Sequence, residues 1–173
     1  MKPQSVTVGS ATVSAWVPLN PRQNPFSVSL AVTLSSGAAL TYKVQHTFDN
    51  PNEFIDCLAT RSTTTATIKY ADHGLTTSDS VVIQGLAPFD SSGTGYAVAS
   101  IVDADTFTVT VANSGSAGYV VRVARARVFD HDTITGKTAQ FSGNYLLPVQ
   151  ACRLNVTSYT SGKATLTALQ AVG

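Results

Sequence analysis

Three histidines are the side chains of this sequence best suited to acid–base or metal chemistry, because imidazole titrates near neutral pH and binds metals. His131 lies between Asp130 and Asp132, and a histidine beside two carboxylates could form a metal corner or an acid–base pair. Consecutive residues of a strand point to opposite faces, so these side chains are not expected to converge. We interpret residues 130–132 as a polar turn before Thr133.

The other two histidines have structural interpretations. His46 lies on the apolar face of an alternating segment, which is typical of a core histidine whose hydrogen bonds are satisfied. His73 precedes Gly74, and glycine favours a turn in which the imidazole binds its own loop. Neither histidine is expected to be a ligand.

Other motifs fall short of a catalytic or cofactor site. Residues 135–138, Thr-Gly-Lys-Thr, resemble the end of a phosphate-binding loop, but that loop needs glycine where His131 stands, and a following helix. No serine lies in a G-x-S-x-G motif, and Cys57 has no assignable base. An aromatic ligand platform is a lesser alternative to simple packing for Trp16, Tyr96, Tyr119 and Tyr145. We predict no catalytic, cofactor-binding or metal-binding residues, and no enzyme.

The elements that hold these residues are expected to be β-strands. The chain has 173 residues, of which 23 are Thr and 20 are Val, and only 12% are charged. β-Branched side chains fit a pleated sheet and lose rotamer freedom in a helix. This composition excludes an all-α protein, and the lack of a long amphipathic segment disfavours a doubly wound α/β fold.

Charge and cysteine usage limit the partners and the location. A net charge of +1 provides no electrostatic footprint for nucleic acid or an anionic membrane. The first ten residues contain no apolar signal region, so we expect synthesis in the cytoplasm without a signal peptide. Cys57 and Cys152 lack zinc-site spacing and are expected to be unpaired, with Cys152 in a core.

Strict alternation of apolar and polar residues predicts paired strands at both ends of the chain. Segments 26–34 and 40–48 each alternate throughout and flank a short glycine-containing loop, which predicts a β-hairpin. Segments 149–159 and 163–171 repeat this arrangement around Ser161 and Gly162. Residues 51–59 are the one segment expected to form a helical turn, with Pro51 at its first position.

The middle of the chain changes character and predicts an inserted module. Between 60 and 125 we expect five short strands, with loops at 86–95 and 113–118. The flanks, 1–59 and 126–173, have the length of one β-sandwich. Val121 and Val123 share parity with Arg125, so a bulge near Ala124 or a change of core is expected. The predicted fold is an all-β, antiparallel, jelly-roll-like β-sandwich with an inserted small β-barrel or sandwich module.

Two sets of segments resemble proteins of tailed bacteriophages. His73-Gly74-Leu75, Asp79-Ser80-Val81, Gly95-Tyr96 and Thr106-Phe107-Thr108 resemble a small β-module that recurs in virion proteins, although Ser78 replaces the usual glycine before Asp79, and residues 93–96 replace a Tyr-Asn-Gly. Residues 21–26, 42–49, 135–138, 143–145 and 153–157 resemble small phage particle proteins.

The resemblance implies a structural virion protein, most of all a capsid decoration or cement protein. Its partners would be the major capsid protein or other virion proteins and further copies of itself, as a dimer or trimer, without nucleic acid or membrane. Its location would be the virion. The alternatives are a tail or head-fibre protein that binds host-surface glycan, and a head–tail adaptor or tail component. A cement protein should present flat contacts rich in Thr, Ser and Ala, whereas a binder should present a concave aromatic site.

Overall fold

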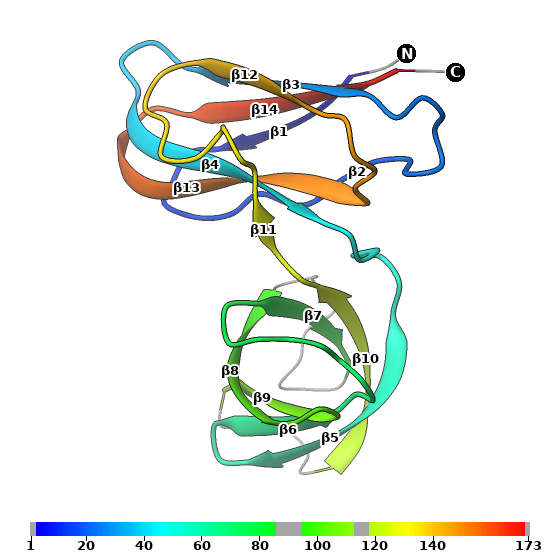
Figure 1. Ribbon diagram of the computed structural model, residues 1–173. Helices are drawn as coiled ribbons and strands as arrows, with labels where there is room; N and C mark the ends of the chain where they lie inside the picture. Colours follow the sequence, from blue (N-terminus) through cyan, green and yellow to red (C-terminus); the bar gives the residue numbers. More distant parts are fainter. Residues whose placement is uncertain (1–2, 86–94, 113–117, 172–173) are drawn as a thin grey trace. The chain divides into compact units, whose positions relative to one another are not determined.

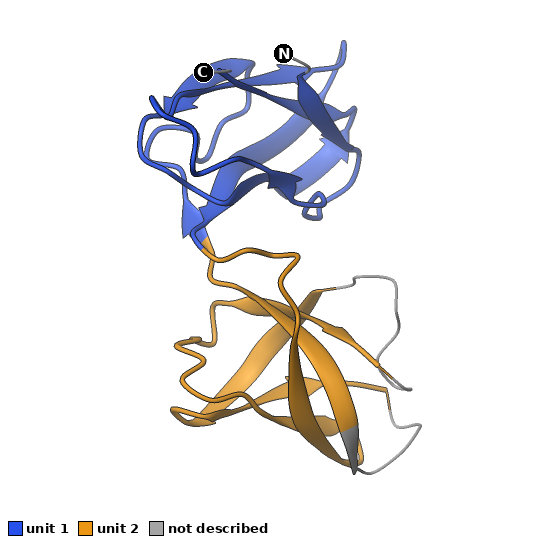
Figure 2. Ribbon diagram, turned by 90° about the vertical axis from the view of Figure 1, so that its right-hand side faces the viewer, with its two compact units in different colours: residues 1–48, 129–173 blue, residues 49–128 orange. Residues whose placement is uncertain are grey.

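The computed structural model describes residues 3–85, 95–112 and 118–171, and it confirms the all-β prediction, with strands and no helix among these residues. The chain divides into two compact units (Figures 1 and 2). Unit 1 combines residues 1–48 with 129–173, and unit 2 is the inserted segment 49–128. The expected loops at 86–95 and 113–118 lie almost wholly outside the described residues.

Unit 1 is a β-sandwich of two four-stranded sheets. The first sheet has the order β1-β14-β3-β12 and the second has the order β11-β4-β13-β2. Successive strands change sheet at every step except from β4 to β11, and eight strands connected in this way form a jelly roll. The strands are β1 (Gln4–Val8), β2 (Val17–Pro18), β3 (Val28–Leu34), β4 (Ala39–Thr47), β11 (Phe129–Asp130), β12 (Phe141–Tyr145), β13 (Ala151–Ser161) and β14 (Ala164–Gln170).

Both predicted hairpins are wrong, although their strands are correct. Strand β3 pairs with β14 and β12, whereas β4 pairs with β13 and β11, so β3 and β4 lie in opposite sheets. The same holds for β13 and β14. Alternation specifies which face of each strand is buried. The buried faces of two successive strands can lie side by side in one sheet or opposite each other across a core. Here each short glycine-containing connection carries the chain across the core as an arch.

The two arches contact each other at one end of the sandwich. The backbone N–H of Ser35 donates to the carbonyl of Lys163 at 3.0 Å, and the N–H of Lys163 donates to the Ser35 hydroxyl at 3.0 Å. The Ser161 hydroxyl donates to the carbonyl of Gly37 at 3.0 Å. These bonds satisfy backbone groups that a hairpin would have paired within itself.

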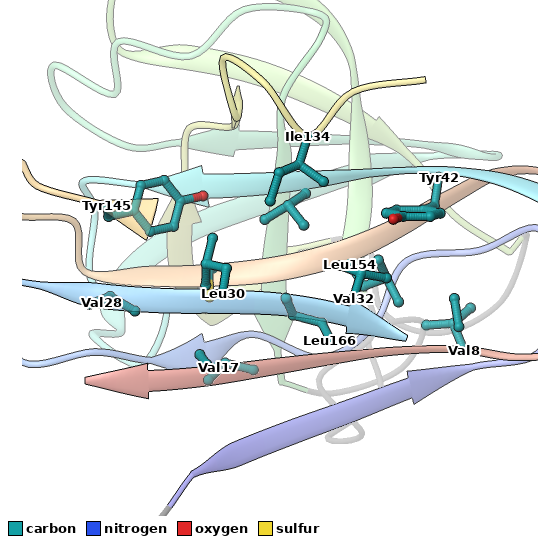
Figure 3. Close-up of a cluster of buried hydrophobic side chains, with 14 of the residues drawn as sticks. Val8, Val17, Val28, Leu30, Val32, Tyr42, Ile134, Tyr145, Leu154 and Leu166 are labelled. Atoms are coloured by element: carbon teal, nitrogen blue, oxygen red, sulfur yellow. The ribbon is translucent and has the colours of Figure 1, made fainter. Parts of the chain in front are cut away.

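The core of unit 1 lies between the inward faces of the two sheets. Figure 3 shows side chains from both sheets meeting there, including Leu30, Leu154 and Leu166. Tyr42 is fully buried among them, and its hydroxyl donates to the carbonyl of Ala139 at 2.7 Å. Cys152 is also fully buried and unpaired, which confirms its assignment to the core.

Unit 2 is a closed six-stranded barrel with strand order β10-β5-β6-β9-β8-β7. Closure leaves no strand of the ring with a free edge. Its interior is filled by residues that alternate along the strands, among them Ile68, Ile83 and Phe107. The strands are β5 (Ile55–Ser62), β6 (Thr65–Lys69), β7 (Ser80–Gln84), β8 (Gly95–Asp103), β9 (Thr106–Thr110) and β10 (Gly118–Ala126).

The entry to unit 2 differs from the sequence-based expectation. Residues 51–59 do not form a helical turn, because strand β5 begins at Ile55 and completes the barrel between β10 and β6. The inserted unit therefore begins at Asp49 rather than at residue 60. The preference of Pro51 for a first helical turn is overridden by the pairing of β5 on both sides.

The exit from unit 2 explains the parity of Val121, Val123 and Arg125 without a bulge. Strand β10 keeps a continuous register with β7 from Arg122 to Ala126. Val121 and Val123 fill the barrel, and Arg125, on the same side, donates to the carbonyl of His73 at 2.9 Å. The buried face of β10 nevertheless changes here, because Ala124 and Ala126 are 1% and 3% exposed while Arg125 between them is partly exposed. The parity therefore reflects a change of buried side at Ala124 without a bulge.

The insertion lies in the connection between two neighbouring antiparallel strands of the sandwich. Strand β11 pairs with β4, with Phe129 opposite His46. We expect a chain in which a short Gly-Ser linker replaces residues 49–128 to fold, because the linker would close an ordinary hairpin and leave the jelly-roll core complete. Far-ultraviolet circular dichroism and thermal unfolding of this shortened chain test the prediction. Aggregation or loss of cooperative unfolding would contradict it.

Candidate functional site

Unit 1 contains a pocket of about 360 Å³ near the end of β4. Nine residues line it: His46, Phe48, His131, Asp132, Asn144, Tyr145, Leu146, Leu147 and Val149. They come from β4, from the segment that follows β11, and from β12 and its connection to β13. The crossing connections of the jelly roll bring these distant parts of the sequence together.

Aromatic rings form a continuous cluster along the pocket. The ring of His46 lies 5.4 Å from that of Phe48, 5.8 Å from that of Phe129 and 5.2 Å from that of Tyr145. The ring of Tyr145 lies 4.9 Å from that of His131. Phe48 keeps 49% of its surface exposed, so the apolar alternation of β4 ends in an open aromatic side chain.

His46 is not the satisfied core histidine that its position in the alternation predicted. Its Nδ1 atom is buried and has no hydrogen-bond partner among the described residues. Burial lowers the pKa of His46, and the nearby His131 lowers it further, against the opposing charges of Asp132 and Asp130. The ring is therefore neutral at pH 7, and it presents hydrogen-bonding atoms rather than a charge.

His131 is more than part of a polar turn, because it is only 6% exposed. Its Nδ1 atom accepts the backbone N–H groups of Thr133 at 3.2 Å and Ile134 at 3.3 Å, which places the proton of the neutral ring on Nε2. That Nε2 has no hydrogen-bond partner in the described chain. Burial lowers the pKa of His131, although a backbone contact with Asn144, which does not meet hydrogen-bond geometry, and the charge of Asp132 oppose the shift.

Strand alternation predicted that His131 would be separated from both neighbouring carboxylates, but only Asp130 is separated from it. Asp130 accepts hydrogen bonds from the Lys43 ammonium at 2.8 Å and from the Gln45 amide at 2.9 Å. His131 lies instead on the pocket side, where Asp132 also contributes to the wall. Within the described residues, no group of three or more His, Cys, Asp or Glu side chains could hold a metal ion.

Tyr145 is the third polar residue of the pocket whose buried atom lacks a partner. Its hydroxyl makes no hydrogen bond to any described residue, whereas that of Tyr42 in the same core does. Because an unpaired buried hydroxyl is costly, we expect Tyr145→Phe to leave the free energy of unfolding unchanged or to raise it, and Tyr42→Phe to lower it by about 1 kcal/mol. Urea denaturation of the two variants compares them directly. An equal loss in both would contradict the assignment.

The four aromatic residues considered as a ligand platform belong to two different units. Trp16 and Tyr145 belong to unit 1, whereas Tyr96 and Tyr119 belong to unit 2. Trp16 instead lies beneath the guanidinium of Arg153, which is 4.5 Å from the centre of its ring.

The 135–138 segment and the two cysteines, which the sequence also offered as candidates, have structural roles. Lys137 exchanges backbone hydrogen bonds with Tyr42, both at 2.9 Å, and its ammonium lies 4.2 Å from the centre of the Phe141 ring. The Thr-Gly-Lys-Thr sequence at 135–138 is therefore an extra pairing segment beside β4. Cys57 in unit 2 and Cys152 are both free, and burial raises their pKa values to about 11 and about 12.

The barrel holds its ionisable groups in a structural network. His73 is buried, and its Nδ1 accepts the N–H of Leu75 at 2.9 Å, as the turn interpretation predicted. Asp49 accepts three hydrogen bonds from Arg127, one from the backbone N–H at 2.8 Å and two from the guanidinium at 3.0 and 2.8 Å. Arg125 lies 3.4 Å from the same carboxylate. This network ties the entry of unit 2 to its exit.

A second candidate surface is the outer face of the β1-β14-β3-β12 sheet, here called the neutral face. The strand registers align its side chains in three rows across the sheet. Within these four strands no charged residue lies on this face. The rows are Thr7-Thr165-Thr33, Ser5-Thr167-Ala31-Ser142 and Leu169-Ser29-Asn144.

Hydrogen bonds within the neutral face hold its hydroxyl groups in place. The Ser5 and Thr167 hydroxyls are 2.8 Å apart, and the Thr7 and Thr165 hydroxyls are 2.9 Å apart. Paired hydroxyls lose little hydrogen bonding when water is removed, so the face is suited to burial against another protein.

Comparison with protein-family models and with curated proteins gives no match to this sequence. The described residues contain no helix long and apolar enough to cross a membrane. The two candidate surfaces, the pocket and the neutral face, are therefore the structural features from which a function can be inferred.

Proposed function

We propose that this chain is a non-enzymatic structural component of a tailed-phage particle, and that it acts as a capsid decoration or cement protein. Its partners are capsid subunits and further copies of itself. The sequence resemblance to virion proteins suggests the setting, and the jelly-roll topology agrees with it by analogy, since this fold is common in viral capsid proteins but also occurs in lectins and cupins.

The neutral face is the observation that carries this proposal. It extends across all four strands of one sheet, and the strand registers align its short polar side chains in rows on the outer surface. Charged residues are normally depleted from the buried centre of an interface because their desolvation is costly. A charge-free face of Thr, Ser and Ala avoids that cost, which suits permanent contact with identical neighbours.

The proposal predicts self-association through the neutral face that depends little on salt. A closed dimer or trimer is the default for identical subunits, and a stable interface buries more than about 1,000 Å². Because the face carries no charge, sedimentation velocity at micromolar protein should give the same oligomer at low and high ionic strength. A strict monomer that also fails to bind empty capsids would overturn the proposal.

A charge placed at the centre of the neutral face should break the oligomer. Ala31→Lys buries an ammonium between Thr167 and Ser142, so we expect the dissociation constant to rise at least about tenfold. The matched control is Thr160→Lys, an exposed position on β13 of the opposite sheet, which should leave association unchanged. Equal behaviour of the two variants in sedimentation would exclude this face as the interface.

The alternative function is a tail or head-fibre protein that binds host-surface glycan. The aromatic-lined pocket is the specific observation in its favour, since ligand sites combine an apolar wall with a few polar groups. A head–tail adaptor or tail component has no comparable feature to support it in the described chain.

A further inference from the structure

The pocket of unit 1 combines an open apolar rim with polar residues, three of which have a buried atom that makes no hydrogen bond within the described chain. Phe48, Leu146 and Leu147 line it and are exposed by 49%, 69% and 74%. His46, His131, Asp132 and Tyr145 line the same pocket. Its volume of about 360 Å³ lies at the small end of the range for ligand sites.

Three buried polar atoms without partners belong to this one pocket wall: Nδ1 of His46, Nε2 of His131 and the hydroxyl of Tyr145. His131 and Tyr145 are each more than nine-tenths buried, at 6% and 8% exposure. Native proteins pair almost all such atoms, with protein groups or with bound molecules. Their gathering at one pocket is a second indication, besides its shape, that the wall is built for an occupant.

The hydrogen-bonding character of the wall selects the class of occupant. His131 offers an N–H donor, Asp132 offers carboxylate acceptors, and the Tyr145 hydroxyl can do both. Closely spaced donors and acceptors are best matched by hydroxyl groups, which also donate and accept. The exposed ring of Phe48 offers an apolar surface beside them. We infer that this pocket binds the pyranose ring of a neutral glycan, with Phe48 against the apolar face of the sugar and the polar wall against its hydroxyls.

The charge state of the pocket agrees with a neutral ligand. Burial lowers the pKa of both His46 and His131, so neither imidazole is cationic at pH 7. Asp132 is then the charged group of the wall and repels anions. Because all three unpartnered atoms are closed to solvent, the sugar reaches them only as the surrounding side chains adjust on binding.

The experiment is a titration of the full-length protein with the methyl glycosides of glucose, galactose and N-acetylglucosamine, followed by nuclear magnetic resonance. We expect at least one glycoside to bind with a millimolar dissociation constant and to shift the resonances of His46 and Tyr145. Phe48→Ala should weaken binding about tenfold, since it removes the apolar platform. Tyr145→Phe should weaken it about fivefold, because it removes one hydrogen bond.

Two variants serve as matched controls. Tyr42→Phe removes a hydroxyl from the same core that is already bonded to Ala139, and Phe141→Ala removes an exposed ring from β12 outside the pocket. Both should bind the glycoside as the unaltered protein does. Absence of binding by all three glycosides would overturn the inference, as would binding unaffected by Phe48→Ala and Tyr145→Phe. Loss of capsid binding in those two variants, without any affinity for glycoside, would assign the pocket to a protein partner instead.

The inference gives the glycan-binding alternative a site but does not depend on assembly through the neutral face. Glycoside binding by a monomer would support the pocket and overturn the proposed self-association. An oligomer that Ala31→Lys disrupts, and that binds no glycoside, would give the opposite result. The two proposals therefore fail separately.

Discussion

Substitution of Gly162 by alanine should destabilise the sandwich unit by about 3 kcal/mol or more. Gly162 lies in the arch between β13 and β14 with φ of +88°, which side chains other than glycine rarely adopt. A Cβ atom at this position would come within 2.5 Å of both Cα and Cβ of Ala38 in the neighbouring arch. Since one of these atoms is backbone, relief requires the two arches to separate. Urea denaturation monitored by the fluorescence of Trp16 measures the loss.

Gly37→Ala is the control that separates backbone strain from the close approach of the arches. Gly37 also has a positive φ, of +70°, but a Cβ atom there would meet nothing within 4 Å. Its cost should be limited to about 1–2 kcal/mol, the penalty of the left-handed conformation. If the two variants lose equal stability, the packing of one arch on the other is not what requires glycine at 162.

Removal of the Asp49 carboxylate has the second large effect, a loss of about 2–3 kcal/mol from the barrel unit in Asp49→Asn. The side chain of Asp49 is 8% exposed and that of Arg127 is 39% exposed, so we expect less than the loss for a fully buried pair. Burial alone would raise the pKa of Asp49, but the hydrogen bonds from Arg127 and the charge of Arg125 outweigh burial and lower it. Thermal unfolding of full-length protein and variant at pH 7 tests the prediction.

The lowered pKa of Asp49 also sets the direction of its pH dependence. A carboxylate with a lower pKa in the folded state contributes stability above its unfolded pKa, and loses it as pH falls through the folded value. The advantage of the unaltered protein over Asp49→Asn should therefore be complete near neutral pH and shrink below about pH 4. A difference that grows on acidification would contradict the assigned role.

The exposed ion pair of unit 1 provides the comparison for Asp49. Asp130 pairs with Lys43 at 2.8 Å, but its side chain keeps 46% of its surface exposed. Water and salt screen such a pair, so Asp130→Asn should cost less than about 1 kcal/mol. A loss as large as that in Asp49→Asn would mean that burial does not distinguish the two carboxylates.

Local patterning was enough to predict strands and buried faces. The nine-residue alternation at 40–48 correctly placed Leu40, Tyr42 and Val44 in a core, because a period of two residues faces one side of a sheet. The change of character after residue 60 predicted an inserted β-module, although its start was set too late. The pattern predicted Cys152 as a buried, unpaired residue for the same reason.

Only the tertiary structure decided which strands pair and where the pocket lies. The loops after β3 and β13 have the composition of hairpin turns, yet both cross between sheets, because the alternative pairing of β3 with β14 buries the same faces. His46 and Tyr145 are almost a hundred positions apart, and their rings lie 5.2 Å apart only once the strands of the jelly roll have assembled. Alternation along a strand specifies a face and not a partner. The neutral face and the pocket are each built from several strands, so they exist only once long-range pairing has set the order and register of those strands.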